Sequence, residues 1–233
     1  MLKFDSEPSI GVLLWDIDGT LIRIKRPNSS SPHKNVLLKR GHTFDPSVVG
    51  LSGRTDFEVF QELTKGELDR NVLSAAFKEL DDESRRLDEI STFDLYPGVQ
   101  TALKTLASMG WVHGILTGNT PDRLASKLKK VGIEDNFSKN LLFGCEFGDS
   151  RELIARRARE FLSLQNYSTV VVVGDTPSDV NAARLSDFPV ICVATGNFSI
   201  SELLSHKPDL LLRDLSADAD SLENFLRSLT LQS

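Results

Sequence analysis

Residues 10–21 read IGVLLWDIDGTL, and this stretch decides the fold class. It begins with an apolar run, Ile10 to Trp15, and continues into two aspartates, Asp16 and Asp18. A short apolar run without polar alternation is typical of a strand that is buried on both faces, as in a parallel sheet. Residues two apart on an extended chain point to the same side, so both carboxylates would face one side where this strand ends.

Similar apolar runs recur along the chain, and helical patterns lie between them. Thr120-Pro121 marks one helix start, because threonine caps a helix well and proline suits the first helical position. Strands that alternate with helices predict a parallel sheet with helices on both faces, an α/β fold. The further strands that we expect are Trp111 to Leu116, Leu141 to Cys145, Thr169 to Val173, Val190 to Val193 and Leu210 to Leu212.

The interval before Trp111 breaks this rhythm. From about residue 36 to residue 90 the pattern is helical, with no good strand candidate. The segment RPNSSSPHKN, residues 26–35, is typical of a flexible connection. We therefore expect a small all-α domain inserted into the α/β domain. The expected boundaries are 22–94 for the insertion, with 1–21 and 95–233 forming the α/β domain.

Composition and charge limit the classes of function. The 233 residues include 27 Lys and Arg against 33 Asp and Glu, a net charge of −6 at pH 7. An acidic chain lacks the basic surface typical of nucleic-acid-binding proteins and of proteins held at anionic membranes. There is no signal-peptide pattern and no apolar stretch near the roughly 20 residues that cross a bilayer, so we expect a cytoplasmic protein. Cys145 and Cys192 are not spaced as metal ligands, and we expect reduced, packed thiols.

Two other expected strands also end in polar residues. Thr117 and Gly118 stand between a strand and a helix, where free backbone N–H groups favour an anion. This signal is weak alone, since such turns are common structural features. Asp175 follows the strand that ends at Val173, and Asp179 lies four residues further on. Asp179 could equally serve as an acidic residue that favours the helix dipole.

The carboxyl ends of parallel strands meet at one edge of a sheet, where such folds place ligands. Asp16, Asp18 and Asp175 would then crowd three negative charges together, which is costly unless a cation lies among them. Oxygen ligands favour Mg²⁺ over zinc or copper. A phosphate above that ion would need a positive side chain, for which Arg151, at the start of a predicted helix, is the best-placed candidate.

The segments WDIDGTL, ILTGN and VVVGDTPSDV, in this order, resemble the first, second and fourth motifs of the haloacid dehalogenase superfamily. The phosphoglycolate phosphatase-like branch is the most similar, since its helical cap is inserted just after the first motif. The resemblance covers nearly the whole chain. It implies a Rossmann-like core and Mg²⁺-dependent phosphoryl transfer through an aspartyl-phosphate.

The resemblance also implies a role for each motif residue. Asp16 would be the nucleophile. Asp18 would protonate the leaving oxygen and then activate water, while its backbone carbonyl would contribute to the metal site. Thr117, with the amides of Gly118 and Asn119, would hold the phosphoryl oxygens. The implied metal ligands are Asp16, Asp18, Asp175 and Asp179.

The third motif departs from the family pattern. It usually supplies a lysine, often before a proline, and no Lys-Pro pair occurs between Thr117 and Asp175. Arg151 would have to replace that lysine, and arginine can do so as a permanently charged fork for phosphate oxygens. Arg156 and Lys139 are the competing candidates.

The insertion contributes Arg54, in the segment LSGRTD at the start of a helix. In similar proteins a cap loop of this kind faces the core site, so Arg54 is a candidate to bind a second anionic group of the substrate. The alternative is a solvated arginine at a helix start. The histidines lack metal-ligand spacing, and we expect packed or surface positions for His33, His42, His113 and His206.

The resemblance therefore implies a Mg²⁺-dependent phosphatase whose partner is a small phosphate ester, not a nucleic acid or a membrane. A sugar-phosphate mutase of the same superfamily would keep all the core motifs and differ only in rebinding its phosphorylated intermediate. A family member that binds metal or phosphate without turnover is the third possibility. The Asp16 and Asp18 pair favours an enzyme, because Asp18 has little purpose without proton transfer. Neither the natural substrate nor the oligomeric state follows from the sequence.

Overall fold

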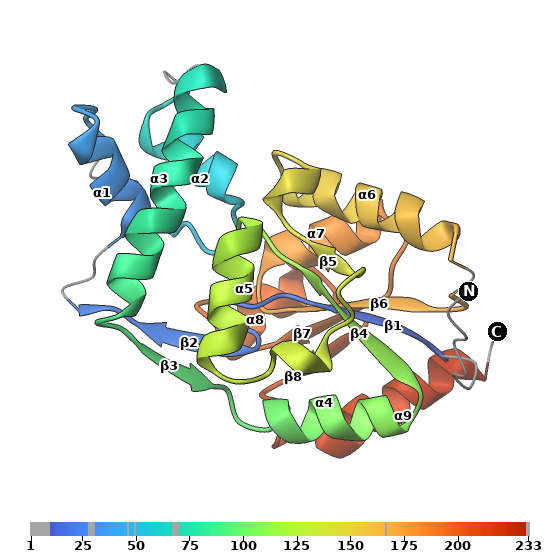
Figure 1. The fold of residues 1–233 in the computed structure, drawn as a ribbon. Helices are drawn as coiled ribbons and strands as arrows, with labels where there is room; N and C mark the ends of the chain where they lie inside the picture. The colour runs from blue at the N-terminus through green and yellow to red at the C-terminus, as the bar shows by residue number, and fades with distance from the viewer. Residues whose placement is uncertain are drawn as a thin grey trace, which may run out of the picture.

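The computed structural model describes residues 10–27, 31–45, 47–48, 50–66, 70–165 and 167–231. Six parallel strands form one sheet in the order β5-β4-β1-β6-β7-β8, with helices on both faces (Figure 1). The parallel α/β fold predicted from the sequence is therefore confirmed. The strands are β1 (Gly11–Trp15), β4 (Trp111–Leu116), β5 (Leu142–Phe143), β6 (Val170–Gly174), β7 (Val190–Val193) and β8 (Leu210–Leu212).

Strand β1 lies in the middle of the sheet, paired with β4 on one side and β6 on the other. Leu13 and Trp15 enter the core on one face, while Val12 and Leu14 enter the core on the opposite face. Both faces are fully buried, which explains why the sequence of this strand shows no polar alternation.

Two sets of helices cover the sheet. The helices α4 (Val99–Ser108), α5 (Pro121–Lys130) and α9 (Ala219–Thr230) contribute apolar side chains to the core of one face. The helices α6 (Arg151–Ser163), α7 (Pro177–Leu185) and α8 (Ile200–Ser205) contribute to the core of the other face. Short 3₁₀ turns occupy Glu134–Asn136 and Cys145–Phe147. In the part of the chain that the structure describes, no helix has the length and apolar character to cross a membrane.

The helical insertion follows β1 and has a core of its own. It contains α1 (Pro32–Lys39), α2 (Asp56–Leu63) and α3 (Arg70–Asp88). An antiparallel pair of strands, β2 (Ile22–Lys25) and β3 (Thr92–Leu95), joins it to the sheet domain. The sequence did not predict these two strands, which are only four residues long and partly exposed. The predicted boundary at 21/22 lies at the start of β2, and the one at 94/95 lies within β3, before its last residue.

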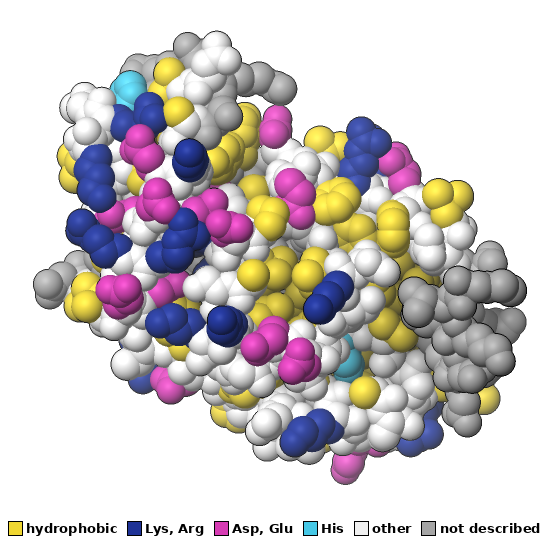
Figure 2. Space-filling model, in the orientation of Figure 1, with side chains coloured by type: hydrophobic (Ala, Val, Ile, Leu, Met, Phe, Trp, Pro, Cys, Tyr) yellow, Lys and Arg dark blue, Asp and Glu magenta, His cyan; other side chains and the backbone are white. Residues whose placement is uncertain are grey.

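The surface agrees with the charge balance of the sequence. Figure 2 shows Lys and Arg side chains mixed with Asp and Glu side chains over the insertion, without one continuous basic patch on this face. Cys145 and Cys192 are both free thiols. His113 is buried in β4, where it accepts a hydrogen bond from the indole of Trp15 (3.0 Å), and His206 is exposed.

Candidate active site

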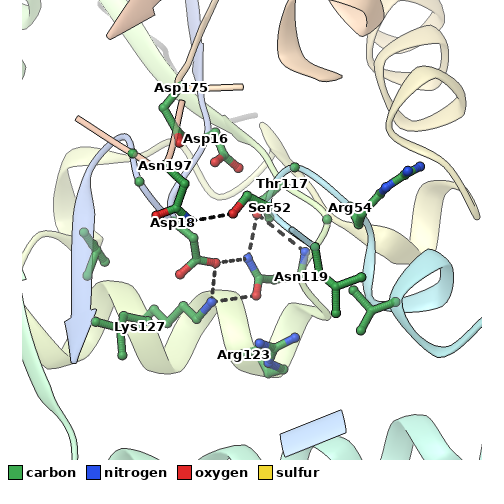
Figure 3. A pocket seen from close by; sticks show the side chains of 18 of the residues that line it. Asp16, Asp18, Ser52, Arg54, Thr117, Asn119, Arg123, Lys127, Asp175 and Asn197 are labelled. Atoms are coloured by element: carbon green, nitrogen blue, oxygen red, sulfur yellow. Dashed lines mark hydrogen bonds and ion pairs between the residues drawn. The ribbon is translucent and has the colours of Figure 1, made fainter. Parts of the chain in front are cut away.

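A cavity of about 620 Å³ lies between the carboxyl ends of the central strands and the helical insertion. Its wall combines residues from the sheet domain with residues from the segment that precedes α2 (Figure 3). The site residues expected from the sequence line it except Asp179, which is fully buried, and the two alternatives to Arg151, which are described below. Those that line it are Asp16, Asp18, Arg54, Thr117, Gly118, Asn119, Arg151 and Asp175.

An acidic cluster occupies the sheet edge. Asp16, Asp175 and Asp179 place carboxylate oxygens within 4.8 Å of one another, and all three residues are buried. Burial, opposed by Arg151 but reinforced by Asp179, raises the pKa of Asp16 to about 7. Burial and the charges of Asp16 and Asp179 raise the pKa of Asp175 well above its usual value. Three carboxyl groups, offset only in part by Arg151, thus present oxygen donors that repel one another when charged, which is the environment that a hard divalent cation such as Mg²⁺ fits.

The turn after β1 brings the first and fourth motifs together. Gly19 has a φ of 94°, a conformation that favours glycine, and a Cβ there would lie 2.3 Å from an oxygen of Asp175. Thr20 donates a hydrogen bond from Oγ1 to Oδ1 of Asp175 (2.9 Å). The D-x-D-G-T sequence therefore supplies both the tight turn and a partner for Asp175.

Arg151 reaches the acidic cluster from the first turn of α6. Its Nη2 lies 2.8 Å from Oδ1 of Asp16 and 2.9 Å from Oδ1 of Asp179. Burial lowers its pKa, but Asp16 and Asp179 outweigh that effect and the net pKa is raised, so the guanidinium stays charged. The competing candidates Lys139 and Arg156 are exposed and do not line the cavity.

Asp18 has different surroundings from Asp16. Its side chain is 43% exposed, and its Oδ2 accepts hydrogen bonds from Asn119 Nδ2 (2.9 Å) and from Lys127 Nζ. Lys127, which is 3% exposed, also donates to Asn119 Oδ1 (2.7 Å). Burial raises the pKa of Asp18, but Lys127 and Asn119 outweigh it, so the net pKa lies below its usual value.

The sequence analysis missed Lys127. The signal that could have revealed it is its position on the buried face of α5, next to Leu128 and three residues after Leu124. A lysine on an apolar stripe needs a partner for its charge, and charged side chains are almost never fully buried without one.

The second motif is held against the insertion. Thr117 is fully buried, and its Oγ1 accepts a hydrogen bond from Asn119 Nδ2 (2.7 Å). The carbonyl of Gly118 accepts a hydrogen bond from the amide of Asp56 in α2 (2.9 Å). A Cβ on Gly118 would lie 2.6 Å from the carbonyl oxygen of Arg54, so this close approach requires glycine.

Asp56 anchors the insertion to the sheet domain, and the sequence analysis also missed it. Its Oδ2 accepts a hydrogen bond from the Thr120 amide (3.0 Å), while its Oδ1 meets Arg123 Nη1 and, at 2.9 Å, His33 Nε2. Burial raises the pKa of Asp56, but Arg123 and His33 outweigh it and hold the pKa well below its usual value. The insertion is therefore closed over the cavity by buried polar contacts.

Arg54 is placed differently from the other candidates. Its Nη2 pairs with Glu62 Oε1 at 2.7 Å, and its side chain is 43% exposed. Figure 3 shows the guanidinium pointing away from Asp16 and Asp18. The structure brings the Arg54 backbone, but not its charge, to the second motif.

Comparisons with known proteins agree with this geometry. The sequence model of the haloacid dehalogenase-like hydrolases matches residues 10–187. Phosphoglycolate phosphatase from Nitrosococcus oceani is 26% identical over 126 residues, which span 52% of this chain and 54% of that protein. The chain therefore aligns with about half the length of this curated relative.

Solved structures share the fold over most of their length. A candidate haloacid dehalogenase-like hydrolase from Bacteroides fragilis has a TM-score of 0.67 and 22% identity, covering 89% of this chain and 98% of that chain. A candidate β-phosphoglucomutase from Bacteroides vulgatus has a TM-score of 0.69 and 20% identity, covering 96% of this chain and 92% of that chain.

At these identities the solved structures show the fold alone, whereas the family assignment depends on the sequence match. That match begins before Asp16 and extends past Asp179, so it includes the whole acidic cluster. The chain belongs to the haloacid dehalogenase-like hydrolase family.

Proposed function

We propose that this protein is a Mg²⁺-dependent phosphatase that hydrolyses a small phosphomonoester through an aspartyl-phosphate on Asp16. The contrast between Asp16 and Asp18 carries the proposal. Asp16 is buried beside Arg151, whereas Asp18 reaches the cavity and is held by Lys127 and Asn119. Two carboxylates in different environments suit two roles, one as nucleophile and the other as proton carrier.

In the first step, an oxygen of Asp16 attacks phosphorus and the bond from phosphorus to the leaving oxygen breaks. Asp18 takes part in this step in its protonated form, gives its proton to that leaving oxygen and so becomes the charged base of the second step. Thr117 and the amides of Gly118 and Asn119 would hold the phosphoryl oxygens, and Arg151 would neutralise part of their charge.

In the second step, water attacks the phosphorus of the aspartyl-phosphate, Asp18 takes the proton from that water, and inorganic phosphate leaves with Asp16 restored. The contact with Lys127 favours the charged form of Asp18, which is the form that accepts this proton. Positioned proton transfer of this kind contributes roughly 10²- to 10⁴-fold in rate.

Asp16, Asp175 and Asp179, with the backbone carbonyl of Asp18, would hold the Mg²⁺ ion. The buried oxygen cluster with its raised pKa values fits such an ion. When bound, Mg²⁺ supplies positive charge that stabilises the phosphoryl group during transfer.

The test is release of inorganic phosphate from a panel of small esters that includes phosphoglycolate, sugar phosphates and nucleoside monophosphates. Each ester is assayed with Mg²⁺ and with EDTA, for the unchanged protein and for Asp16→Asn. We expect metal-dependent release that the substitution abolishes. Release that survives Asp16→Asn in a folded protein would overturn the proposal, and a trapped sugar bisphosphate with little free phosphate would favour the mutase.

A further inference from the structure

A second group of positive side chains lines the cavity beyond the site of phosphoryl transfer. Arg26 follows β2 at the base of the insertion, and Arg123 and Lys127 lie one turn apart on α5. Figure 3 shows Lys127 and Arg123 on the side of Asp18 that faces away from Asp175. Because Asp18 is the proposed proton donor to the leaving oxygen, the part of the substrate that leaves would extend toward these cations.

Two of these cations have hydrogen-bonding capacity that the protein leaves unused. Arg123 is 7% exposed, and its Nη1 meets Asp56, but its buried Nε has no partner among the described residues. Arg26 makes a long contact from Nη2 to Asp88 (3.5 Å), and its buried Nε likewise has no partner there. A buried donor without a partner costs about 1 to 3 kcal/mol, so both groups would gain from an anionic acceptor.

Lys127 differs from these arginines, because Asp18 and Asn119 already occupy its ammonium. Its charge nevertheless adds to the positive potential of this wall. Burial and the neighbouring Arg123 lower the pKa of Arg26, and Asp18 and Asp88 oppose that effect only in part. Each cation of this wall meets one carboxylate, so the capacity that remains lies in the unpartnered Nε donors of Arg26 and Arg123 and in the weak, 3.5 Å contact of Arg26 with Asp88.

We propose that Arg26 and Arg123 form a subsite for a second anionic group, a carboxylate or a phosphate, on the leaving part of the substrate. The inference rests on the proposed phosphatase function and narrows its substrate class to esters that carry two anionic groups. The guanidinium edge matches both carboxylate and phosphate, since two parallel N–H groups can meet two oxygens.

This assignment replaces Arg54 with residues that the sequence did not single out. The Arg54 guanidinium forms an ion pair with Glu62, which lies in the same part of the insertion. Arg26 and Arg123 come from the two sides of the cavity, the base of the insertion and the sheet domain. A substrate anion would therefore contact both parts of the protein while the cavity is closed.

The test compares esters that differ only in the second charge. Phosphoglycolate is paired with 2-hydroxyethyl phosphate, and propane-1,3-diol bisphosphate with 3-hydroxypropyl phosphate, so that the two pairs separate a carboxylate from a phosphate. For the unchanged protein with Mg²⁺, we expect kcat/KM to favour the charged member of at least one pair by roughly tenfold or more. Equal kcat/KM within both pairs would overturn the inference.

The variants Arg26→Gln and Arg123→Lys should reduce that preference by roughly tenfold, mainly through KM. Arg213→Gln, in an exposed ion pair with Asp218, is the matched control and should leave the preference unchanged. An equal loss of kcat/KM for charged and neutral esters would mean a structural role only and would refute the subsite. If Arg123→Lys does not fold, Arg26→Gln alone decides, because within the described residues the Arg26 side chain makes a single polar contact, the long one with Asp88.

Binding without turnover gives a second readout. Phosphonoacetate should bind the unchanged protein with Mg²⁺ more tightly than ethylphosphonate in calorimetry, and Arg26→Gln should remove the difference. Equal affinities, together with equal kcat/KM in both ester pairs, would reject the subsite while leaving the phosphatase intact. Failure to hydrolyse any ester, charged or neutral, would instead reject the phosphatase function on which the subsite rests.

Discussion

The acidic cluster predicts that metal binding and pH act together on stability. In the metal-free fold the pKa of Asp16 is about 7, against 3.8 for an unperturbed carboxyl. A pKa difference of this size corresponds to about 4 kcal/mol, at about 1.4 kcal/mol for each tenfold change. The folded protein keeps the Asp16 proton to a higher pH than the unfolded chain does. Metal-free stability should therefore fall as the pH rises from about 4 to about 7.

Over the accessible range from about pH 5.5 to about pH 8, this linkage amounts to about 2 kcal/mol. A protein of this size shifts its melting temperature by about 2 to 4 °C for each kcal/mol, so the metal-free Tm should fall by about 4 to 8 °C. A bound divalent cation offsets the repulsion. Stabilisation by Mg²⁺ should consequently be larger at the higher pH. Asp56 does not contribute to the pH dependence in this range, because its pKa is lowered and it titrates only in more acidic solution.

The assay is thermal unfolding in EDTA and in Mg²⁺ across this pH range. Asp16→Asn is the matched control, since it removes the Asp16 carboxyl with little change in size. Asp175, whose pKa is also raised, and His33 and His113, whose pKa values are lowered by burial, remain in the variant. The contribution of Asp16 is therefore the difference between the two proteins in EDTA, and the unchanged protein should lose more stability than Asp16→Asn as the pH rises. Equal Mg²⁺ stabilisation at both ends of the range would refute the reasoning. So would a pH dependence in EDTA that is the same for the unchanged protein and for Asp16→Asn.

Three further predictions follow from the contacts of the site. Arg151→Met leaves Asp16 and Asp179 without their buried cation. It should lower kcat by roughly a hundredfold or more and lower the free energy of unfolding in denaturant by about 3 kcal/mol, with Arg151→Lys intermediate. Full activity in Arg151→Met would contradict this role of Arg151. Lys127→Met removes the charge that lowers the pKa of Asp18, so the acid limb of the kcat–pH profile should move to higher pH, and an unmoved limb would exclude this coupling. Asp56→Ala leaves Arg123 without its buried carboxylate and should lower the free energy of unfolding by about 3 to 5 kcal/mol. Asp187→Ala, in the exposed pair with Arg159, should lower it by less than about 1 kcal/mol. Similar losses for the two variants would show that Asp56 does not anchor the insertion.

The sheet could be predicted from the sequence because its strands are buried on both faces. Runs such as Ile10 to Trp15 show this burial directly in their composition, and the acidic residues that follow them meet because parallel strands end at one edge. The ribbon of β2 and β3 could not be found in this way. Its strands are short and half exposed, so their composition carries no comparable signal.

The partners of the charged side chains were harder to predict than the strands. Lys127 meets Asp18 across 109 positions of the chain, and Arg123 meets Asp56 across 67. Because the partners are so far apart along the chain, the residues next to Lys127 and Arg123 do not indicate which carboxylate each side chain meets. Arg54 illustrates the converse case, because its charge is plain in the sequence while the pairing with Glu62 depends on how the chain is folded around α2.

The most direct test of the central claim is to locate the phosphoryl group during turnover. The protein is mixed with Mg²⁺ and an ester that it hydrolyses, and the reaction is quenched in acid within a single turnover. The phosphorylated peptide is then identified by mass spectrometry. Our account predicts an acid-stable phosphoryl group on the peptide that contains Asp16, absent from Asp16→Asn. In Asp18→Asn, which retains the nucleophile but has lost both the proton donor and the base, the group should form more slowly and, once formed, persist longer. Phosphate release without any phosphorylated Asp16, or a label on another residue, would contradict the account.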